Sequence, residues 1–476
     1  MRRPVLLAVV AGVLVTSGLP PFGWWALTLV GMAMLVLSVE SRSFRERAWI
    51  GLAFGVGFLA PGLFWMTEFS LPGWVLAMLL ESAFVAVAVA ATPRRGWLVL
   101  TLPSAFVLSD AFRGAWPFGG VPIATLGQTQ VGGPLLQVAR LGGALLITAV
   151  VAAAGVGLAS LVRRRWLTAA LAAAAVVAVT IAGALAPDGT KIGELRASAV
   201  QGGGRRGTRA INTSEARVFR AQVQATAGVP EGVDLILWPE DVIDVDSDDV
   251  FRTPQGRTMA GLAADHEATV VAGVVAGADD RPFFNTAQVW RPDGTSGDSY
   301  EKNVRVPFGE WIPFRSLVDR FADLSAVPRD AHVGHGPAVV RTPKGRMGVL
   351  ISYEVFFARR ARSALRHDAE VLLVPTNATS YSTTQMPALE VGAARLRAVE
   401  TGRSLLQAAP TGFSASVDHR GRVRDQTDLG RRAVLTTTLH RRGGTTPYTR
   451  VGDVPFLVAA LVVLLASWQL TRRSST

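Results

Sequence analysis

The chain has 476 residues, of which 49% are hydrophobic, a formal net charge of +12 and no cysteine. The lack of cysteine excludes disulfide bonds, zinc–thiolate sites and thiol catalysis, and we expect no metal and no cofactor. The positive charge does not indicate nucleic-acid binding, because segments 1–187 and 472–473 hold 14 basic and 5 acidic residues, whereas the rest of the chain holds 34 basic and 31 acidic residues.

Apolar residues dominate both ends of the chain. A helix needs about 20 mostly apolar residues to cross a membrane, and eight stretches are candidates. They are residues 4–19, 22–39, 48–66, 73–91, 97–112, 134–161, 166–187 and 454–471. A tight turn at Pro20, Pro21 and Gly23 separates the first two. We therefore predict a membrane α-helical bundle of about eight spans that carries one soluble domain.

The arginines predict the direction of the spans. If the N-terminus is cytoplasmic, twelve arginines flank spans on the cytoplasmic side and only Arg113 and Arg140 lie outside. We expect a seven-span membrane domain at 1–187, an extracytoplasmic domain at 188–452, and an eighth span with a cytoplasmic tail at 453–476. The scarcity of lysine beside abundant Arg, Ala, Val and Gly is typical of a GC-rich bacterial genome. The predicted location is therefore the bacterial plasma membrane.

Three acidic residues lie in or near the predicted spans. Charged groups inside a membrane are costly and often functional. For Glu68 and Asp110, a place at the outer interface or at a helix cap is the simpler interpretation. Glu81 lies deeper, and both interpretations stay open for it.

Strand-like and helix-like patterns alternate between the last two spans. The strand-like runs are continuously apolar, which indicates burial on both faces. They cover 195–201, 234–240, 268–276, 347–354, 370–376 and 404–410, with helical patterns at 212–227, 254–266, 355–366 and 387–401. This alternation predicts an α/β domain or an αββα sandwich, with its chemistry at the carboxyl ends of the strands.

Three polar residues lie at or just after such ends: Glu240, Lys302 and Ser352. Each also has a simpler interpretation, as a helix-capping acid, a solvated surface charge and an ordinary small residue, respectively. Lysine occurs elsewhere only at Lys191 and Lys344, in a chain that otherwise uses arginine. A compact ammonium can approach a reacting atom in a way that a planar guanidinium does not reproduce.

The motifs around these three residues resemble the nitrilase superfamily and, within it, the apolipoprotein N-acyltransferases. The motifs are WPE (238–240), Y-x-K-x-x-x-VPFGEWIPF (300–314) and SYE (352–354). Further matching segments are LPPFGWW (19–25), GLFWM (62–66), WPFGGVPIATLGQ (116–128), 376–412 and the strand-turn-strand DHRGRV (418–423). The resemblance implies a nitrilase-like αββα sandwich above a membrane bundle.

The resemblance also implies a role for each motif residue. Glu240 matches the general base, Lys302 the oxyanion-stabilising lysine and Ser352 the position of the nucleophile. The supporting residues it implies are Glu310, Glu354 and the backbone N–H of Tyr353. The implied reaction moves an acyl chain from a phospholipid to the enzyme and then to the α-amine of a diacylglyceryl cysteine on an apolipoprotein. The implied partners are therefore phospholipid and lipoprotein, and we expect the enzyme to be a monomer.

The chain departs from the family pattern at the nucleophile, which is cysteine in the family and Ser352 here. The nearby family segments TND-x-W-F-G and N-N-G become TNATSYS and PTG (410–412). Serine ionises far less readily than cysteine and needs a base during attack. Two alternatives therefore remain beside the acyltransferase. One is a weakly active or non-catalytic relative that binds lipoproteins or assists another acyltransferase, and the other is a membrane-tethered nitrilase-like amidase.

Several aromatic residues are candidates for substrate contact, because aromatic side chains settle at membrane interfaces. Trp238, Trp311 and Phe308 are the predicted substrate-binding residues. The segments 112–134 and 303–328, with Trp116, Phe118, Phe314 and Phe321, would guide acyl chains. Packing of the soluble domain onto the spans explains these aromatics equally well.

Overall fold

The computed structural model describes residues 2–93, 98–207, 212–277, 281–320, 324 and 327–473. The chain divides into two compact units. The first comprises Met1–Pro187 and Thr446–Thr476, and the second comprises Asp188–Thr445. Arg94 and Arg95, two of the twelve arginines counted on the cytoplasmic side, and Phe321 lie outside the described residues.

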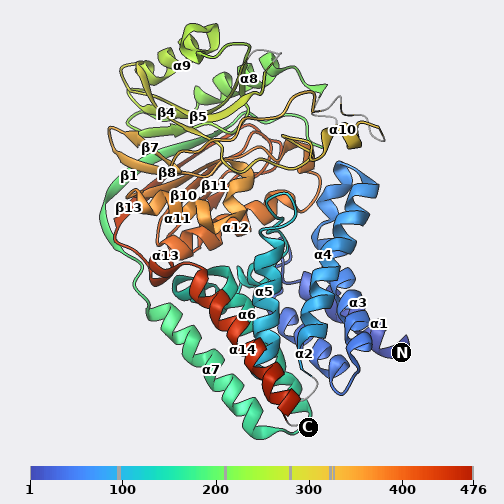
Figure 1. Cartoon of the computed structure of the whole chain (residues 1–476). Helices are drawn as coiled ribbons and strands as arrows, with labels where there is room; N and C mark the ends of the chain where they lie inside the picture. Colours follow the sequence, from blue (N-terminus) through green and yellow to red (C-terminus); the bar gives the residue numbers. More distant parts are fainter. Residues whose placement is uncertain are drawn as a thin grey trace. The chain divides into compact units, whose positions relative to one another are not determined.

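The first unit is helical, and a helix occupies each of the eight apolar stretches (Figure 1). The helices are α1 (Arg2–Thr16), α2 (Trp25–Val39), α3 (Phe44–Gly62), α4 (Leu71–Ala91), α5 (Leu98–Arg113), α6 (Ala139–Val162), α7 (Trp166–Leu185) and α14 (Val454–Arg473). The short helix α13 (Pro447–Val451) and the 3₁₀ turns η1 (Phe64–Glu68), η2 (Gly127–Gln130) and η3 (Pro134–Val138) join them. Small residues allow close approach in this bundle: a Cβ on Gly12 would lie 2.2 Å from the backbone oxygen of Phe54.

Four helical segments of the described chain are long and apolar enough to cross a membrane. They are Leu71–Ala91, Pro134–Val162, Trp166–Leu185 and Val454–Arg472, and the shorter apolar helices are Arg3–Thr16 and Trp25–Val39. The first unit thus has the helices of a membrane domain, while the count of about eight spans stays a prediction.

The second unit contains two stacked β-sheets with helices on their outer faces (Figure 1). The first sheet has the order β13-β1-β2-β4-β5-β6, with β3 added beside β4. Its strands are β1 (Thr190–Gln201), β2 (Leu235–Leu237), β3 (Ile243–Val245), β4 (Thr269–Ala276), β5 (Phe284–Trp290), β6 (Ser296–Glu301) and β13 (Ala433–Gly443). Parallel pairs join β1 to β2, β2 to β4, and β3 to β4.

The second sheet has the order β12-β11-β10-β9-β8-β7. Its strands are β7 (Val339–Thr342), β8 (Gly345–Val349), β9 (Val371–Pro375), β10 (Leu405–Ala408), β11 (Ala415–Val417) and β12 (Val423–Gln426). The strands β8, β9 and β10 run parallel, so their carboxyl ends lie at one edge. The predicted strand-turn-strand at DHRGRV corresponds to β11, a turn and β12.

Helices cover both sheets, which gives the helix–sheet–sheet–helix layering expected from the sequence (Figure 1). On the first sheet these are α8 (Glu215–Thr226) and α9 (Pro254–Asp265), and on the second α11 (Ala358–Arg366) and α12 (Met386–Thr401). The remaining short elements are η5 (Val250–Arg252), α10 (Arg315–Val318), η6 (Ser352–Phe356) and η7 (Thr379–Tyr381). An apolar core between the first sheet and its helices includes Ile236, Trp238 and Trp290, which are fully buried.

Candidate active site

Glu240 follows β2 on a segment that is bonded to the neighbouring strand β4. The Trp238 N–H donates to the Val271 oxygen at 2.8 Å, and the Gly273 N–H donates to the Pro239 oxygen at 3.0 Å. A Cβ on Gly273 would lie 2.4 Å from the Glu240 Cα, so only glycine permits this approach. The local packing therefore holds Glu240, which is 4% exposed, at the carboxyl end of the sheet.

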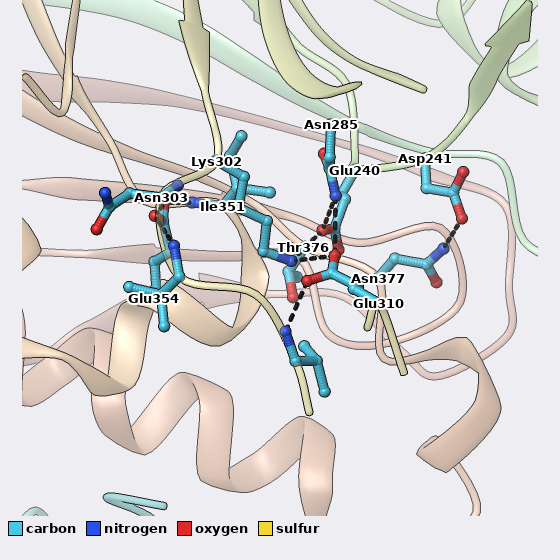
Figure 2. A network of polar contacts seen from close by, with 12 residues as sticks. Glu240, Asp241, Asn285, Lys302, Asn303, Glu310, Ile351, Glu354, Thr376 and Asn377 are labelled. Carbon is cyan, nitrogen blue, oxygen red and sulfur yellow. Dashed lines mark hydrogen bonds and ion pairs between the residues drawn. The ribbon is translucent and has the colours of Figure 1, made fainter. Parts of the chain in front are cut away.

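Lys302 follows β6 and is the centre of a buried polar cluster (Figure 2). Its Nζ donates to Oε1 of Glu240 and to Oε1 of Glu310, both at 2.7 Å. The Asn285 side-chain amide donates to the same two oxygens at 2.9 and 3.0 Å. The second oxygen of Glu310 accepts from the Val306 N–H at 2.7 Å. One cation and two carboxylates thus share a site that is almost closed to water.

Lys302 and Glu240 can each make one further hydrogen bond. An ammonium has three N–H donors, and two of those of Lys302 are used by described residues. Oε2 of Glu240 has no hydrogen-bond partner among the residues that the structure describes. Burial raises the pKa of Glu240; Lys302 opposes this rise and Glu310 adds to it. Burial alone would lower the pKa of Lys302, but Glu240 and Glu310 raise it above the ordinary lysine value, so the ammonium stays charged.

Ser352 lies at a sharp bend after β8. The sequence predicted a strand through this residue, but β8 ends at Val349, and the 3₁₀ turn η6 begins at Ser352. Its backbone adopts a left-handed conformation, with φ of +47°. A non-glycine residue in this region carries about 1–3 kcal/mol of strain, and such residues cluster at functional sites. Within the described part of the chain its Oγ makes no hydrogen bond, and the residue is 8% exposed.

Glu354 joins the segment of Lys302 to the turn of Ser352. Its Oε1 accepts from the N–H groups of Asn303 at 2.9 Å and Val304 at 3.1 Å, and its Oε2 accepts from the Ile351 N–H at 2.9 Å. The Tyr300 hydroxyl donates to this carboxylate at 2.7 Å. The side chain is fully buried, so it fixes the residues next to Lys302 against the residue before Ser352 (Figure 2).

Of the three predicted substrate-binding aromatics, Trp238, Trp311 and Phe308, Phe308 is the most exposed, at 43%. Trp311 is partly buried beneath the Arg305 guanidinium, 4.8 Å from the ring centre. Trp238 is fully buried, packs against Phe219 and donates its indole N–H to the Thr226 hydroxyl at 3.0 Å. Because the Trp238 side chain is buried in the core, no part of it is exposed to contact a substrate.

Sequence reasoning missed several polar residues of the cluster. Asn285 lies in an apolar strand pattern, and its amide gave no signal before the structure placed it between Glu240 and Glu310. Thr376, which Figure 2 draws with the cluster, donates to Glu390 on α12 at 2.7 Å. Among the described residues no group of three or more His, Asp or Glu has metal-binding geometry.

Comparison with known proteins agrees with this architecture. The model of the apolipoprotein N-acyltransferase N-terminal domain matches residues 11–157, and the carbon-nitrogen hydrolase model matches residues 150–447. The chain is 28% identical to the apolipoprotein N-acyltransferase of Photobacterium profundum, over 99% of this chain and 96% of that protein. It is 27% identical to the protein of that name from Mycolicibacterium smegmatis, over 99% of this chain and 88% of that protein.

Among solved structures, Saccharomyces cerevisiae Nit3, a member of branch 10 of the nitrilase superfamily, covers 53% of this chain at 17% identity, with a TM-score of 0.38. The carbon-nitrogen hydrolase match spans more than half of the chain and takes in Glu240, Lys302 and Ser352. The protein therefore belongs to the carbon-nitrogen hydrolase family.

Proposed function

We propose that this protein is a membrane-bound N-acyltransferase of the apolipoprotein type, with Ser352 as its nucleophile. Relatives of that name match it over nearly its full length. The observation that carries the proposal is the buried Glu240–Lys302–Glu310 cluster, tied by Glu354 to a left-handed turn with an unbonded serine hydroxyl.

Acylation would begin with attack of the Ser352 Oγ on the ester carbonyl of a phospholipid. Glu240 takes the hydroxyl proton, and general-base assistance of this kind contributes about 10²–10⁴-fold in rate. The remaining N–H of Lys302 and the Tyr353 amide stabilise the oxyanion, each worth roughly 3–4 kcal/mol. When the intermediate collapses, the bond to the glycerol oxygen breaks, and that oxygen receives the proton from Glu240. The products are an acyl ester on Ser352 and a lysophospholipid.

The second half-reaction transfers the acyl group to the α-amine of a diacylglyceryl cysteine. The amine attacks the ester, Glu240 takes a proton from the nitrogen, and the Ser352 Oγ leaves and is protonated. An alkoxide leaves less readily than a thiolate, because its conjugate acid is far weaker. We therefore expect this step to be slow compared with acylation.

The arrangement in the membrane belongs to the same proposal. The protein would be a monomer, and all eight of its apolar helices would cross the bilayer. The domain at 188–452 would lie outside the cytoplasm, and both termini would lie inside it. The arginine distribution supports this direction. Each unit has exposed aromatic residues, Trp116 and Phe118 in the first and Phe308 and Phe314 in the second, which support contact of each with acyl chains at the outer leaflet.

Mass spectrometry of the purified enzyme after incubation with phospholipid tests the proposal. We expect an acyl adduct on the peptide that contains Ser352, and none in Ser352→Ala. The same gene should restore triacylated lipoprotein in a strain that lacks the enzyme. Absence of an adduct in the unmodified enzyme would favour the non-catalytic relative, and release of ammonia from small amides would favour the amidase.

A further inference from the structure

Glu390 is a buried acid beside the catalytic cluster to which the mechanism above assigns no role. It lies in the second turn of α12 and is 2% exposed. The helix packs against η6, which begins at Ser352. Oε1 of Glu390 accepts a hydrogen bond from the Thr376 hydroxyl at 2.7 Å. Its Oε2 is buried, with no partner among the described residues.

The nearby charges do not neutralise Glu390. Glu240 and Lys302 are the charged groups that act on it electrostatically, with opposite signs. The Lys302 ammonium is already bonded to Glu240 and Glu310. Other titratable or charged groups on α12 and the elements packed against it are Tyr353 and Glu354 on η6, Arg359, Arg360, Arg362 and Arg366 on α11, and Arg395, Arg397 and Glu400 on α12 itself. Tyr381 on η7 also interacts with Glu390.

This environment favours a neutral carboxylic acid. A buried carboxylate with one hydroxyl donor and no bonded cation loses far more solvation than it regains. Burial accordingly raises the pKa of Glu390 to about 8; Thr376 opposes the rise, Glu240 adds to it, and Lys302 opposes it. At neutral pH Glu390 therefore holds its proton.

We propose that Glu390 stays protonated through turnover and thereby keeps the cluster of Lys302, Glu240 and Glu310 at one net negative charge, which lets the oxyanion form beside it. The inference rests on the proposed function, because the oxyanion is that of acyl transfer. Glu390 is a positioning residue: it acts through Glu240 and Lys302. A charged Glu390 would make the net charge of this low-dielectric site more negative by one unit. The negatively charged oxyanion would then have to form in a site that repels it more strongly.

This arrangement predicts an alkaline limit on acylation. Above pH 8 the ionised fraction of Glu390 grows, and the rate should fall about tenfold for each further pH unit. Deprotonation of Lys302 or Tyr381 would not explain such a limit, because the pKa of each of these groups is raised. Measuring only the first half-reaction removes the acceptor amine as well.

The test is the pH profile of lysophospholipid release in a single turnover, for the unmodified enzyme and for Glu390→Gln. The amide keeps the size of the side chain and cannot ionise, so we expect near-normal acylation at pH 7 and no alkaline fall near pH 8. Thr376→Val removes the hydroxyl that favours the charged form, and should move the limit to higher pH. Glu400→Gln, on the same helix, is the control and should keep the limit of the unmodified enzyme.

The same alkaline fall in Glu390→Gln would overturn the inference, as would an unmodified enzyme that shows no fall. Infrared difference spectra between pH 7 and alkaline pH give a readout that needs no turnover. A protonated-carboxyl band should disappear near pH 8 in the unmodified enzyme and be absent from Glu390→Gln. If the band behaves so but no acyl adduct forms, the proposed function fails while the protonation of Glu390 stands; a missing band contradicts the inference itself.

Discussion

Each unit of the protein buries a cation between two carboxylates, and the two clusters differ in what they are connected to. In the helical unit Arg113 contacts Glu81 and Asp110 and is fully buried. Its remaining donors reach the backbone oxygens of Ile123 and Ala124 at 3.2 and 3.3 Å. Asp110 in turn accepts from the Leu126 N–H and the Thr148 hydroxyl. Every guanidinium nitrogen and both Asp110 oxygens therefore have partners, whereas Oε1 of Glu81 has none among the described residues.

The cluster around Lys302 is tied through Glu354 to a turn that carries an unbonded hydroxyl. One ammonium donor, Oε2 of Glu240 and the Ser352 Oγ have no partner among the described residues. Buried polar groups are nearly always hydrogen-bonded, so unbonded ones call for an explanation. The Arg113 guanidinium fastens the loop of Ile123 and Ala124 to its helix, whereas the Lys302 segment is tied through Glu354 to a turn whose serine hydroxyl is unbonded and can react. The comparison thus assigns the Arg113 cluster to structure and the Lys302 cluster to chemistry.

The largest expected effect is that of Glu240→Gln, which removes the proposed base. Acylation of Ser352 should fall by about 10²–10⁴-fold, because a serine hydroxyl needs a base to take its proton during attack. The rate of lysophospholipid release in a single turnover measures the loss.

A matched comparison in the Ser352→Cys background sharpens this prediction. A thiol is a few per cent ionised near neutral pH, so it depends less on a base. Glu240→Gln should therefore cost clearly less in that background. Equal losses in both would mean that Glu240 does not act on the nucleophile's proton.

Lys302→Gln should lower the acylation rate by about 10²–10³-fold, as loss of one oxyanion donor does in other enzymes. The amide can still donate to Glu240 and Glu310, so the segment keeps part of its bonding. Thermal unfolding should distinguish loss of chemistry from loss of fold. An acylation rate close to that of the unmodified enzyme would remove Lys302 from the mechanism.

Arg113→Met tests the structural half of the comparison. Removing one partner of a buried ion pair typically costs about 3–5 kcal/mol, because the carboxylates of Glu81 and Asp110 lose their cation. The unfolding temperature in detergent should fall, while acylation per folded molecule stays unchanged. Adding Glu81→Gln and Asp110→Asn should recover part of the stability. A large loss of rate in fully folded Arg113→Met would show that this cluster is not structural alone.

The sequence predicted the positions of the polar residues better than their partners. Glu240 and Lys302 do follow strands, because runs such as LILW and the turn after QVW mark where strands end. Asn285 and Glu390 gave no signal, since one lies in a strand pattern and the other in a helical one. Their roles depend on contacts between segments far apart in the chain, which local periodicity does not encode.

The strands show the same difference between features that a local sequence pattern predicts and features that it does not. The buried parallel strands were recognisable as continuous apolar runs, whereas β13, which pairs along β1, was missed. Its sequence AVLTTTLHRRG is mostly only partly buried and rich in threonine, so it lacks such a run. The predicted strand through Ser352 was too long, because a left-handed serine ends it and sequence propensity does not report that conformation.

The smallest effect is expected from Tyr300→Phe, which loosens the link between the two halves of the site. The Tyr300 hydroxyl donates to Glu354 and accepts from Arg360 at 2.7 Å. Without it, the buried Glu354 keeps its three backbone donors, and the cost should be about 1–3 kcal/mol. Hydrogen exchange should quicken at the amides of Asn303, Val304 and Ile351, all of which bond to Glu354. Unchanged exchange there would mean that Glu354 holds the Ser352 turn unaided, and that the site's geometry depends on its carboxylate alone.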